Sequence, residues 1–342
     1  MVISLAELAA QLGVPFRGDG SIAIEGVATL QNAAPGRLSF LANPRYRQYL
    51  GTTRAAAVVI ASQDEEHCPV PALVSDNPYA TYARAAALLY PSAAAQRGVH
   101  PSACVDPDAR LAEDAWIGPM TVVEAGVVIE AGAQIGPACV IAQGARVGAH
   151  SRLVAQVTLC HGVQIGCRAL IHPGVVIGSD GFGIANESGH WIKVPQVGSV
   201  VIGDDVEIGA NTSIDRGAVE DTVLEDGVKL DNQIQVGHNV HIGAHTAIAG
   251  CVGIAGSARI GRHCAIGGGA GILGHLELAD HVQVTAMTLV TRSLTEPGVY
   301  SSGVPAQPGT AWNRNYARFR ELDELARRVR ELEKKLAASG KA

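Results

Sequence analysis

The residues best suited to chemistry are two histidines in the second half of the chain. His238 lies in LDNQIQVGHNVHIG, and His275 lies 37 residues further on in GILGHLEL. A neutral imidazole is the usual general base near pH 7. No GxSxG elbow, phosphate-binding glycine loop or cysteine nucleophile motif accompanies them. Two interpretations stay open for His238, a general base or a plain turn residue.

A second candidate group lies near the N-terminus, where LSFLANPRYRQYL brings Phe40, Asn43 and Tyr46 together beside an expected helix start at Pro44. An aromatic ring and an amide can stack on a nucleobase and read its edge. The alternative is structural, with Phe40 in a core and Tyr46 on a helix face.

A repeat of six residues must position the histidines. Small or turn-forming residues usually follow its aliphatic position, as in IGPACV, IGDDVE and IGRHCA. An amphipathic helix would repeat at 3.6 residues and a plain strand at 2. The aliphatic positions are Val99, Val105, Leu111, Ile117, Val123, Ile129, Ile135, Ile141, Val147, Leu153, Leu159, Ile165, Ile171, Ile177, Ile202, Ile208, Ile214, Leu224, Leu230, Val236, Ile242, Ile248, Ile254, Ile260, Ile266, Ile272, Leu278, Val284 and Val290.

This period predicts a β-solenoid, a parallel β-helix in which a short strand and a tight turn occur three times in each coil. The aliphatic side chains point inward, while Gly, Asn and Asp take the turn positions that need φ > 0. Coils stack at roughly 4.8 Å, so we expect His238 and His275 on one face, roughly 10 Å apart. Residues 178–201 interrupt the ladder and predict an extruded loop. Such insertions often serve binding, although a neutral insertion is the alternative.

Flanking segments without the repeat surround the solenoid. We expect a small α/β domain at 1–98, the β-helix at 99–305 and a helical region at 306–342. The first domain should hold a helix with a Ser4–Glu7 capping box that stops at Gly13, a buried strand at 55–60 and a helix at 77–90 that Pro78 begins.

The C-terminal region reads as one helix from Trp312 to Leu336. Its leucines and valine alternate by three and four, which is typical of a short coiled-coil seam. Basic residues outnumber acidic ones there and include Arg318 and Arg320. The helix therefore either presents a solvated face beside an oligomer seam or docks an acidic partner.

Composition narrows the cellular setting. The formal net charge of -6 argues against nucleic acid as a general partner. The N-terminus has Glu7 early and no basic start before an apolar stretch, so we expect no signal peptide. No run approaches the ~18 apolar residues of a transmembrane segment. Seven cysteines without a CxxC pair fit a reducing compartment. We therefore expect a cytoplasmic protein.

Longer motifs carry a resemblance across the whole chain. GSDGFGIA, the stretch from WIKVPQVGSVV to VGHNVHIG, GIAGSARIG, GHLELAD and TRSLTEPGVYSSGVPAQP are far more specific than the hexad. Together they resemble the UDP-3-O-acylglucosamine N-acyltransferases of lipid A biosynthesis. The resemblance implies a left-handed β-helix, a handedness that the spacing does not give, with an N-terminal uridine-binding domain and a C-terminal helix.

The resemblance also implies roles for individual residues. His238 matches the catalytic histidine, which would take the proton from the attacking amine. His275 matches a second active-site histidine that helps to bind the sugar nucleotide. Phe40, Asn43 and Tyr46 match uridine-contacting positions, while Arg292 and the C-terminal helix with Arg318 and Arg320 lie where carrier-protein contacts are expected.

The implied partners follow the reaction. Members of the family are homotrimers with active sites at the subunit boundaries. They move a 3-hydroxyacyl chain from acyl carrier protein to the 2-amino group of a UDP-3-O-acylglucosamine. No metal and no other cofactor is required, because the thioester and a general base supply the chemistry.

Three rival functions remain at this point. One is a sugar acetyltransferase that uses acetyl-CoA, against which the N-terminal domain and the basic helix argue. Another is a zinc enzyme of the gamma-class carbonic anhydrase type, with His238, His275 and His281 as ligands. The third is a solenoid that binds without catalysis.

Overall fold

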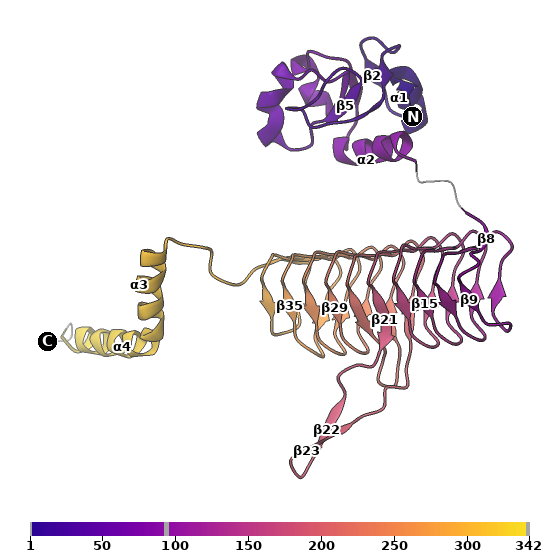
Figure 1. The fold of residues 1–342 in the computed structure, drawn as a ribbon. Helices are drawn as coiled ribbons and strands as arrows, with labels where there is room; N and C mark the ends of the chain where they lie inside the picture. The colour runs from indigo at the N-terminus through magenta and orange to yellow at the C-terminus, as the bar shows by residue number, and fades with distance from the viewer. Residues whose placement is uncertain (1, 92–95, 340–342) are drawn as a thin grey trace. The chain divides into compact units, whose positions relative to one another are not determined.

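The structure is a computed structural model that describes residues 2–91 and 96–339, and the chain divides near residue 94 into two compact units. The first unit is an α/β domain (Figure 1). Its sheet has the order β2-β7-β6-β5-β4, parallel except for the β2–β7 pair, and β1 pairs with β3 outside it. The elements are β1 (Ile3–Ser4), α1 (Leu5–Leu12), β2 (Phe16–Arg17), β3 (Ala23–Ile24), β4 (Gly26–Val27), β5 (Arg37–Phe40), the 3-10 helices η1 (Pro44–Thr52) and η2 (Ser62–His67), β6 (Ala57–Ile60), β7 (Ala72–Val74) and α2 (Pro78–Leu89).

The predicted elements of this unit are confirmed. The Ser4 hydroxyl accepts from the Glu7 N–H, and the Glu7 carboxylate accepts from the Ser4 N–H, which completes the capping box. Gly13 ends α1 with φ 66°. Strand β6 is fully buried in the sheet, and α2 starts at Pro78 as expected.

The second unit contains a left-handed parallel β-helix with three faces, which confirms the predicted solenoid (Figure 1). The eleven-strand face holds β8 (Gly98–Val99), β11 (Trp116–Ile117), β14 (Gln134–Ile135), β17 (Arg152–Leu153), β20 (Leu170–Ile171), β25 (Glu207–Ile208), β28 (Lys229–Leu230), β31 (Ala247–Ile248), β34 (Ala265–Ile266), β37 (Val282–Val284) and β39 (Gly298–Tyr300).

The other two faces complete each coil. The ten-strand face holds β9 (Cys104–Val105), β12 (Val122–Val123), β15 (Val140–Ile141), β18 (Thr158–Leu159), β21 (Val176–Ser179), β26 (Ser213–Asp215), β29 (Gln235–Val236), β32 (Gly253–Ile254), β35 (Gly271–Ile272) and β38 (Leu289–Val290). The nine-strand face holds β10 (Arg110–Leu111), β13 (Val128–Ile129), β16 (Arg146–Val147), β19 (Gln164–Ile165), β24 (Val200–Ile202), β27 (Thr222–Leu224), β30 (His241–Ile242), β33 (Arg259–Ile260) and β36 (Glu277–Leu278).

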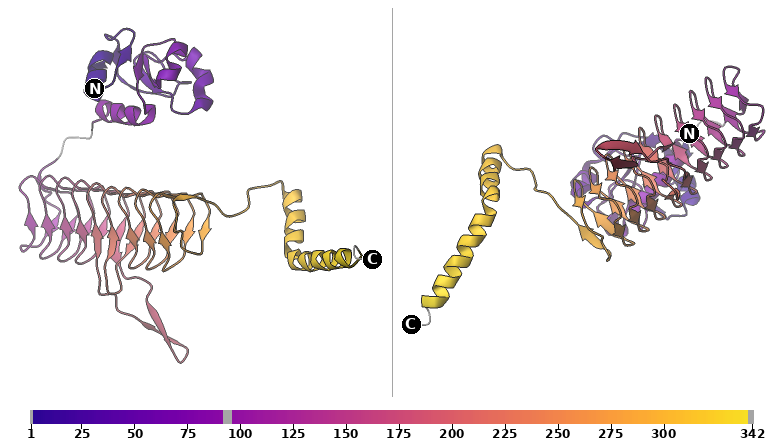
Figure 2. Two further views of the ribbon diagram at one scale, coloured as in Figure 1. Left: turned by 180° about the vertical axis from the view of Figure 1, so that it is seen from behind. Right: turned by 90° about the horizontal axis from the view of Figure 1, so that it is seen from below.

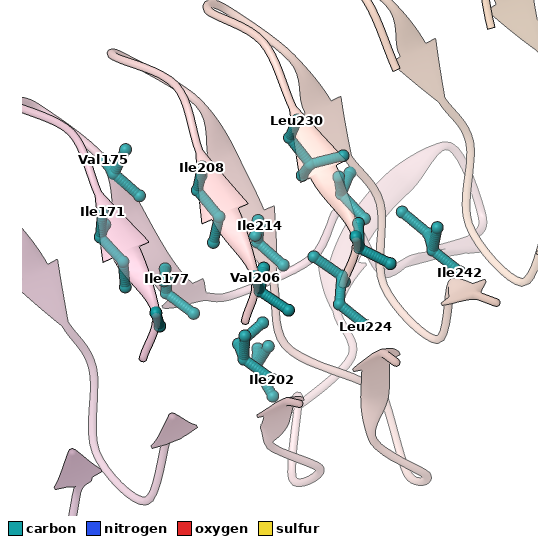
Figure 3. Close-up of a cluster of buried hydrophobic side chains, with 14 of the residues drawn as sticks. Ile171, Val175, Ile177, Ile202, Val206, Ile208, Ile214, Leu224, Leu230 and Ile242 are labelled. Atoms are coloured by element: carbon teal, nitrogen blue, oxygen red, sulfur yellow. The ribbon is translucent and has the colours of Figure 1, made fainter. Parts of the chain in front are cut away.

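The core of the β-helix is narrow and aliphatic because the repeat directs one side chain of each strand inward. Figure 3 shows these side chains converging from the three faces, among them Ile171, Ile177, Ile202, Ile208, Ile214, Leu224, Leu230 and Ile242. A second inward position lies two residues before each of them. It holds small side chains such as Ala133, Cys139 and Val157, all fully buried.

The turn positions differ from the prediction that Gly, Asn and Asp would fill them. Left-handed φ values occur also at Met120, Arg168, His263 and Met287, among other residues. The reason is that the turn is fixed by backbone hydrogen bonds between coils, such as His263 N–H to Ala244 O at 3.0 Å. These bonds offset the modest strain of a left-handed residue that has a side chain.

The chain leaves the stack within the predicted interval 178–201, but both ends of that interval still belong to β21 and β24, and the segment between them forms more than a loop. Strands β22 (Ile184–Glu187) and β23 (His190–Lys193) pair antiparallel and project from the side of the β-helix (Figures 1 and 2). The chain then rejoins the stack in register, with β24 beside β19. We call residues 180–199 the hairpin insertion.

The C-terminal region differs from the single predicted helix. It consists of α3 (Gly309–Arg320) and α4 (Leu322–Ser339). The Glu321 N–H donates to Arg318 O at 3.0 Å, which tightens the last turn and ends α3. The apolar seam from Leu322 to Leu336 lies in α4 and is exposed in the chain.

Candidate functional site

His238 lies in the turn that follows β29 on the ten-strand face, and its imidazole is partly buried. Its Nδ1 lies 2.9 Å from Asn239 Oδ1. Two hydrogen bonds fix which end of the Asn239 side-chain amide is the oxygen. Its Nδ2 donates to Glu220 O at 2.7 Å, and its Oδ1 accepts from the Ala218 N–H at 3.0 Å. Oδ1 can therefore only accept, so Nδ1 of His238 donates and Nε2 carries the lone pair.

Two glycines allow the imidazole to occupy this place. A Cβ at Gly181 would meet His238 Cβ at 2.6 Å, and a Cβ at Gly256 would meet His238 Nε2 at 2.6 Å. The ring therefore lies between the hairpin insertion and the next coil. In the described part of the chain, the Gly256 N–H donates no hydrogen bond, and a Cβ on this residue would meet Nε2.

Arg216 anchors the hairpin insertion at both ends and is only 3% exposed. Its backbone N–H donates to Ser179 O at 2.8 Å, and its Nε donates to Gly198 O at 2.7 Å. Its guanidinium also contacts the ring of His161 and donates to the His161 carbonyl. Gly181 is thereby held against His238.

Asp215 ends β26, the strand that pairs with β29 on the ten-strand face. It accepts from Ser179 Oγ at 3.0 Å and from Gln235 Nε2 at 3.0 Å. Burial raises the pKa of Asp215 above its ordinary value, and its two hydrogen bonds and the charge of His238 oppose that shift. A carboxylate in these surroundings interacts strongly with any cation that approaches the histidine.

His275 lies two coils further along the same face, in the turn after β35, as the spacing predicts. It is exposed and has φ 61°. The structure brings His275 together with Asn239 in one groove, since both line it. The other lining residues are Ala218, Val219, Glu220, Ser257, Arg259 and Glu277.

The N-terminal unit has its own pocket, and Phe40, Asn43 and Tyr46 line it together, as expected. Asn43 caps η1 by accepting from the Arg45 N–H at 3.0 Å, so its Nδ2 is left to donate. Tyr46 is 49% exposed at the rim. The remaining lining residues are Thr29, Leu30, Gln31, Asn32, Ala42 and Tyr79.

Phe40 serves the core as well as the pocket. Its ring stacks on Tyr82 with centroids 4.0 Å apart and meets Tyr79 at 5.6 Å. The two interpretations of Phe40 are therefore compatible. Tyr79 was missed in the sequence, although its position directly after the helix-starting Pro78 was a usable signal.

The predicted basic residues are all exposed. Arg292 follows β38, whereas Arg318 and Arg320 lie in the last turn of α3. Within residues 2–91 and 96–339, none of the three forms an ion pair. They remain available to an acidic partner.

Among the described residues, no group of three or more His, Cys, Asp or Glu side chains is placed to hold a metal ion, and this includes His238, His275 and His281. No helix in the described ranges is long and apolar enough to cross a membrane.

Comparison with known proteins agrees with this arrangement. A family model described as UDP-3-O-(3-hydroxymyristoyl) glucosamine N-acyltransferase, LpxD, matches residues 21–88. The UDP-3-O-acylglucosamine N-acyltransferase of Pseudomonas aeruginosa (strain UCBPP-PA14) is 53% identical over 335 residues, 98% of this chain and 95% of that protein. The protein of the same name from Hahella chejuensis is 54% identical over 330 residues, 96% of this chain and 95% of that protein.

Among solved structures, an Arabidopsis UDP-N-acetylglucosamine acyltransferase aligns with a TM-score of 0.55 at 18% identity, covering 60% of this chain and 71% of that one. This likeness supports the β-helix fold alone. The near full-length identity to the curated proteins goes further and confirms the resemblance found in the motifs. The chain belongs to the family of UDP-3-O-acylglucosamine N-acyltransferases.

Proposed function

We propose that this protein transfers a 3-hydroxyacyl chain from acyl carrier protein to the 2-amino group of UDP-3-O-(3-hydroxyacyl)glucosamine, in the cytoplasm, as a step of lipid A biosynthesis. The observation that carries this proposal is the tautomer in which Asn239 holds the His238 imidazole. Its Nδ1 is held by Asn239 at 2.9 Å, so Nε2 is left as a base. The relatives at 53% and 54% identity carry the name of this reaction.

His238 acts as the general base. The neutral amine attacks the thioester carbonyl and must lose a proton as the C–N bond forms, and Nε2 of His238 takes that proton. Collapse of the tetrahedral intermediate breaks the C–S bond, and the imidazolium returns the proton to the leaving thiolate. The hydrogen bond to Asn239 keeps the ring in the tautomer that this exchange needs.

The Gly256 N–H is the donor that we assign to the oxyanion. It belongs to the residue whose Cβ would meet His238 Nε2, and it donates to no group of the described chain. A donor fixed in the backbone needs no rearrangement as negative charge develops on the carbonyl oxygen. Base and donor thus come from adjacent coils, beside Asn239 and Ser257 of the groove, and neither a metal nor another cofactor is needed.

The substrates are assigned to three surfaces. The N-terminal pocket would bind the uracil ring, with Phe40 and Tyr46 as stacking partners and Asn43 Nδ2 as a donor to a carbonyl oxygen. His275 would bind the sugar nucleotide from the groove that it shares with Asn239. Arg292 and the end of α3, with Arg318 and Arg320, would dock the acidic carrier protein.

A homotrimer is the assembly that we propose. The hairpin insertion exposes Trp191 at 67% and Phe182 at 82%, and an isolated two-stranded hairpin is marginal in water. The seam of α4 is likewise uncovered within the described chain. Contacts between copies would cover both surfaces, with each groove closed by a neighbouring subunit.

The test is an acyl transfer assay with defined substrates. The purified protein is incubated with UDP-3-O-acylglucosamine and a panel of acyl carrier protein thioesters, and mass spectrometry identifies the products. We expect a diacyl product with a new amide. His238→Ala should lose about 10²–10⁴-fold in rate while keeping its melting temperature. Near-normal turnover of that variant would remove His238 from the mechanism.

A further inference from the structure

Asp215 is a polar group beside His238 that the proposed mechanism does not use. Strands β26 and β29 are neighbours on the ten-strand face, with Ser213 opposite Gln235 and Ile214 opposite Val236. Asp215 is therefore next to Gly237, one residue before His238. Because Gly237 has no side chain, it does not separate the carboxylate from the imidazole.

Both oxygens of the carboxylate are fixed by neutral donors from the two adjacent coils. Ser179 Oγ donates to Oδ1 at 3.0 Å, and Gln235 Nε2 donates to Oδ2 at 3.0 Å. Each oxygen keeps lone-pair capacity, because a carboxylate has about four acceptor sites. The carboxylate is thus held in one place and can still accept hydrogen bonds.

No cationic side chain of the described residues contacts this carboxylate. Lys193, on the hairpin insertion, pairs with Asp180. Arg216, the next residue in sequence, is turned away toward Gly198 and His161. His238 is the basic group whose charge acts on the pKa of Asp215, and its Nδ1 is bound to Asn239. A partly buried carboxylate that otherwise has only neutral donors gains free energy when a cation binds to it.

We propose that Asp215 binds the protonated 2-amino group of the acceptor sugar and thereby selects an amine acceptor over a hydroxyl acceptor. This inference rests on the proposed function and adds the group that recognises the nucleophile. An ammonium has three N–H donors, which fit the open lone pairs of the carboxylate. Binding there would hold the nitrogen next to His238. The ammonium then releases one proton to bulk water, the neutral amine attacks the thioester carbonyl, and His238 takes the second proton as the C–N bond forms.

The test measures binding without the acyl donor, so that catalysis does not enter. Calorimetry compares UDP-3-O-acylglucosamine with UDP-3-O-acylglucose, which carries a 2-hydroxyl in place of the amine. At a pH where the amine is protonated, the wild-type protein should prefer the amine by about tenfold or more, the usual size of a hydrogen bond between charged groups. Asp215→Asn should bind both ligands alike.

A matched control is Asp205→Asn. Asp205 is also a carboxylate of the β-helix with hydrogen-bonded partners, but it pairs with Arg168 in an exposed turn. This variant should keep the preference of the wild-type protein. Melting temperatures of both variants show whether either substitution disturbs the coils.

A pH series on the wild-type protein keeps the test decisive if Asp215→Asn does not fold. The preference should decline as pH rises through the pKa of the amine, about 8 for an ordinary amine beside electron-withdrawing groups. It should also decline in acid, once Asp215 is protonated. A preference that stays flat from about pH 6 to about pH 9 would overturn the inference.

Two other outcomes distinguish a failure of this inference from a failure of the proposed function. If wild-type protein neither binds nor N-acylates the sugar nucleotide, the proposed function fails. If it does both, but Asp215→Asn keeps the preference for the amine and only lowers kcat, Asp215 acts on the imidazolium of His238 rather than on the substrate. That result would overturn the inference and leave the function in place.

Discussion

The substitution Gly256→Ala tests the position of the His238 ring with one methyl group. Gly256 does not have a left-handed φ, so the backbone accepts alanine without strain. The new Cβ would lie 2.6 Å from Nε2 and 2.7 Å from Cε1 of His238. That is about 1 Å inside the optimal contact distance, so the ring must move.

The expected loss follows from that displacement. A shift of about 1 Å in a catalytic group costs on the order of 10²-fold in rate, and loss of the base costs about 10²–10⁴-fold. We therefore expect kcat to fall by about 10²–10⁴-fold, or roughly 2.7–5.4 kcal/mol of barrier. The melting temperature should change little, because the methyl group meets only the end of one side chain.

The assay is steady-state acyl transfer with the carrier-protein thioester, accompanied by thermal unfolding. Gly253→Ala, in β32 of the same coil, is the folding control, since a Cβ there meets nothing within 4 Å. In the double variant with His238→Ala, the glycine substitution should add no further loss. Wild-type kcat in Gly256→Ala, or full additivity in the double variant, would refute this account of the site.

Four further outcomes are expected. Phe40→Ala should weaken binding of the UDP moiety by about 1–3 kcal/mol, measured by calorimetry, and unchanged affinity would leave Phe40 as a core residue only. Sedimentation should show three times the chain mass of 35.3 kDa, and a fully active monomer would contradict the trimer. The KM for the carrier protein should rise steeply with salt, and Arg318→Glu with Arg320→Glu should reproduce this rise, whereas an equally good acyl-CoA donor would count against docking. The hydrogen bond from His241 lowers the pKa of Glu225 in the folded protein. The ionised Glu225 carboxylate therefore stabilises the fold above the pKa that it has in the unfolded chain, and this stabilisation is lost as pH falls through its folded-state pKa. In Glu225→Gln, the free energy of unfolding from urea titrations should fall less steeply in acid. An unchanged dependence on pH would contradict this role of Glu225.

The solenoid was predictable because each coil buries an aliphatic residue at the same step. The second inward position, two residues before each aliphatic residue of the repeat, could not be predicted from the sequence. The Ala, Cys and Val residues there do not differ from their neighbours in hydropathy. Ala133 and Cys139, for example, are as buried as the isoleucines. The break at Glu321 was also hidden, because neither proline nor glycine marks it.

The candidate site was predictable only in part. His238 stood out through its motif, and the structure adds the groups that act on it. Asn239 holds the ring and is itself held by the preceding coil, and Asp215 lies on the strand that pairs with β29. Such contacts depend on the path of the insertion and on side-chain conformation, neither of which the six-residue period contains.

The way in which the hairpin insertion rejoins the stack has a consequence for how the family can diversify. Strand β24 pairs with β19 as if no residues had intervened, and each coil bonds only to its two neighbours. Exchange or lengthening of the tip around Ser188 therefore leaves the folding of every coil unchanged. Natural variation can remodel the tip of the hairpin insertion there, while Arg216 keeps Gly181 against the base. Tips can accordingly be exchanged between relatives without disturbing the residues around His238.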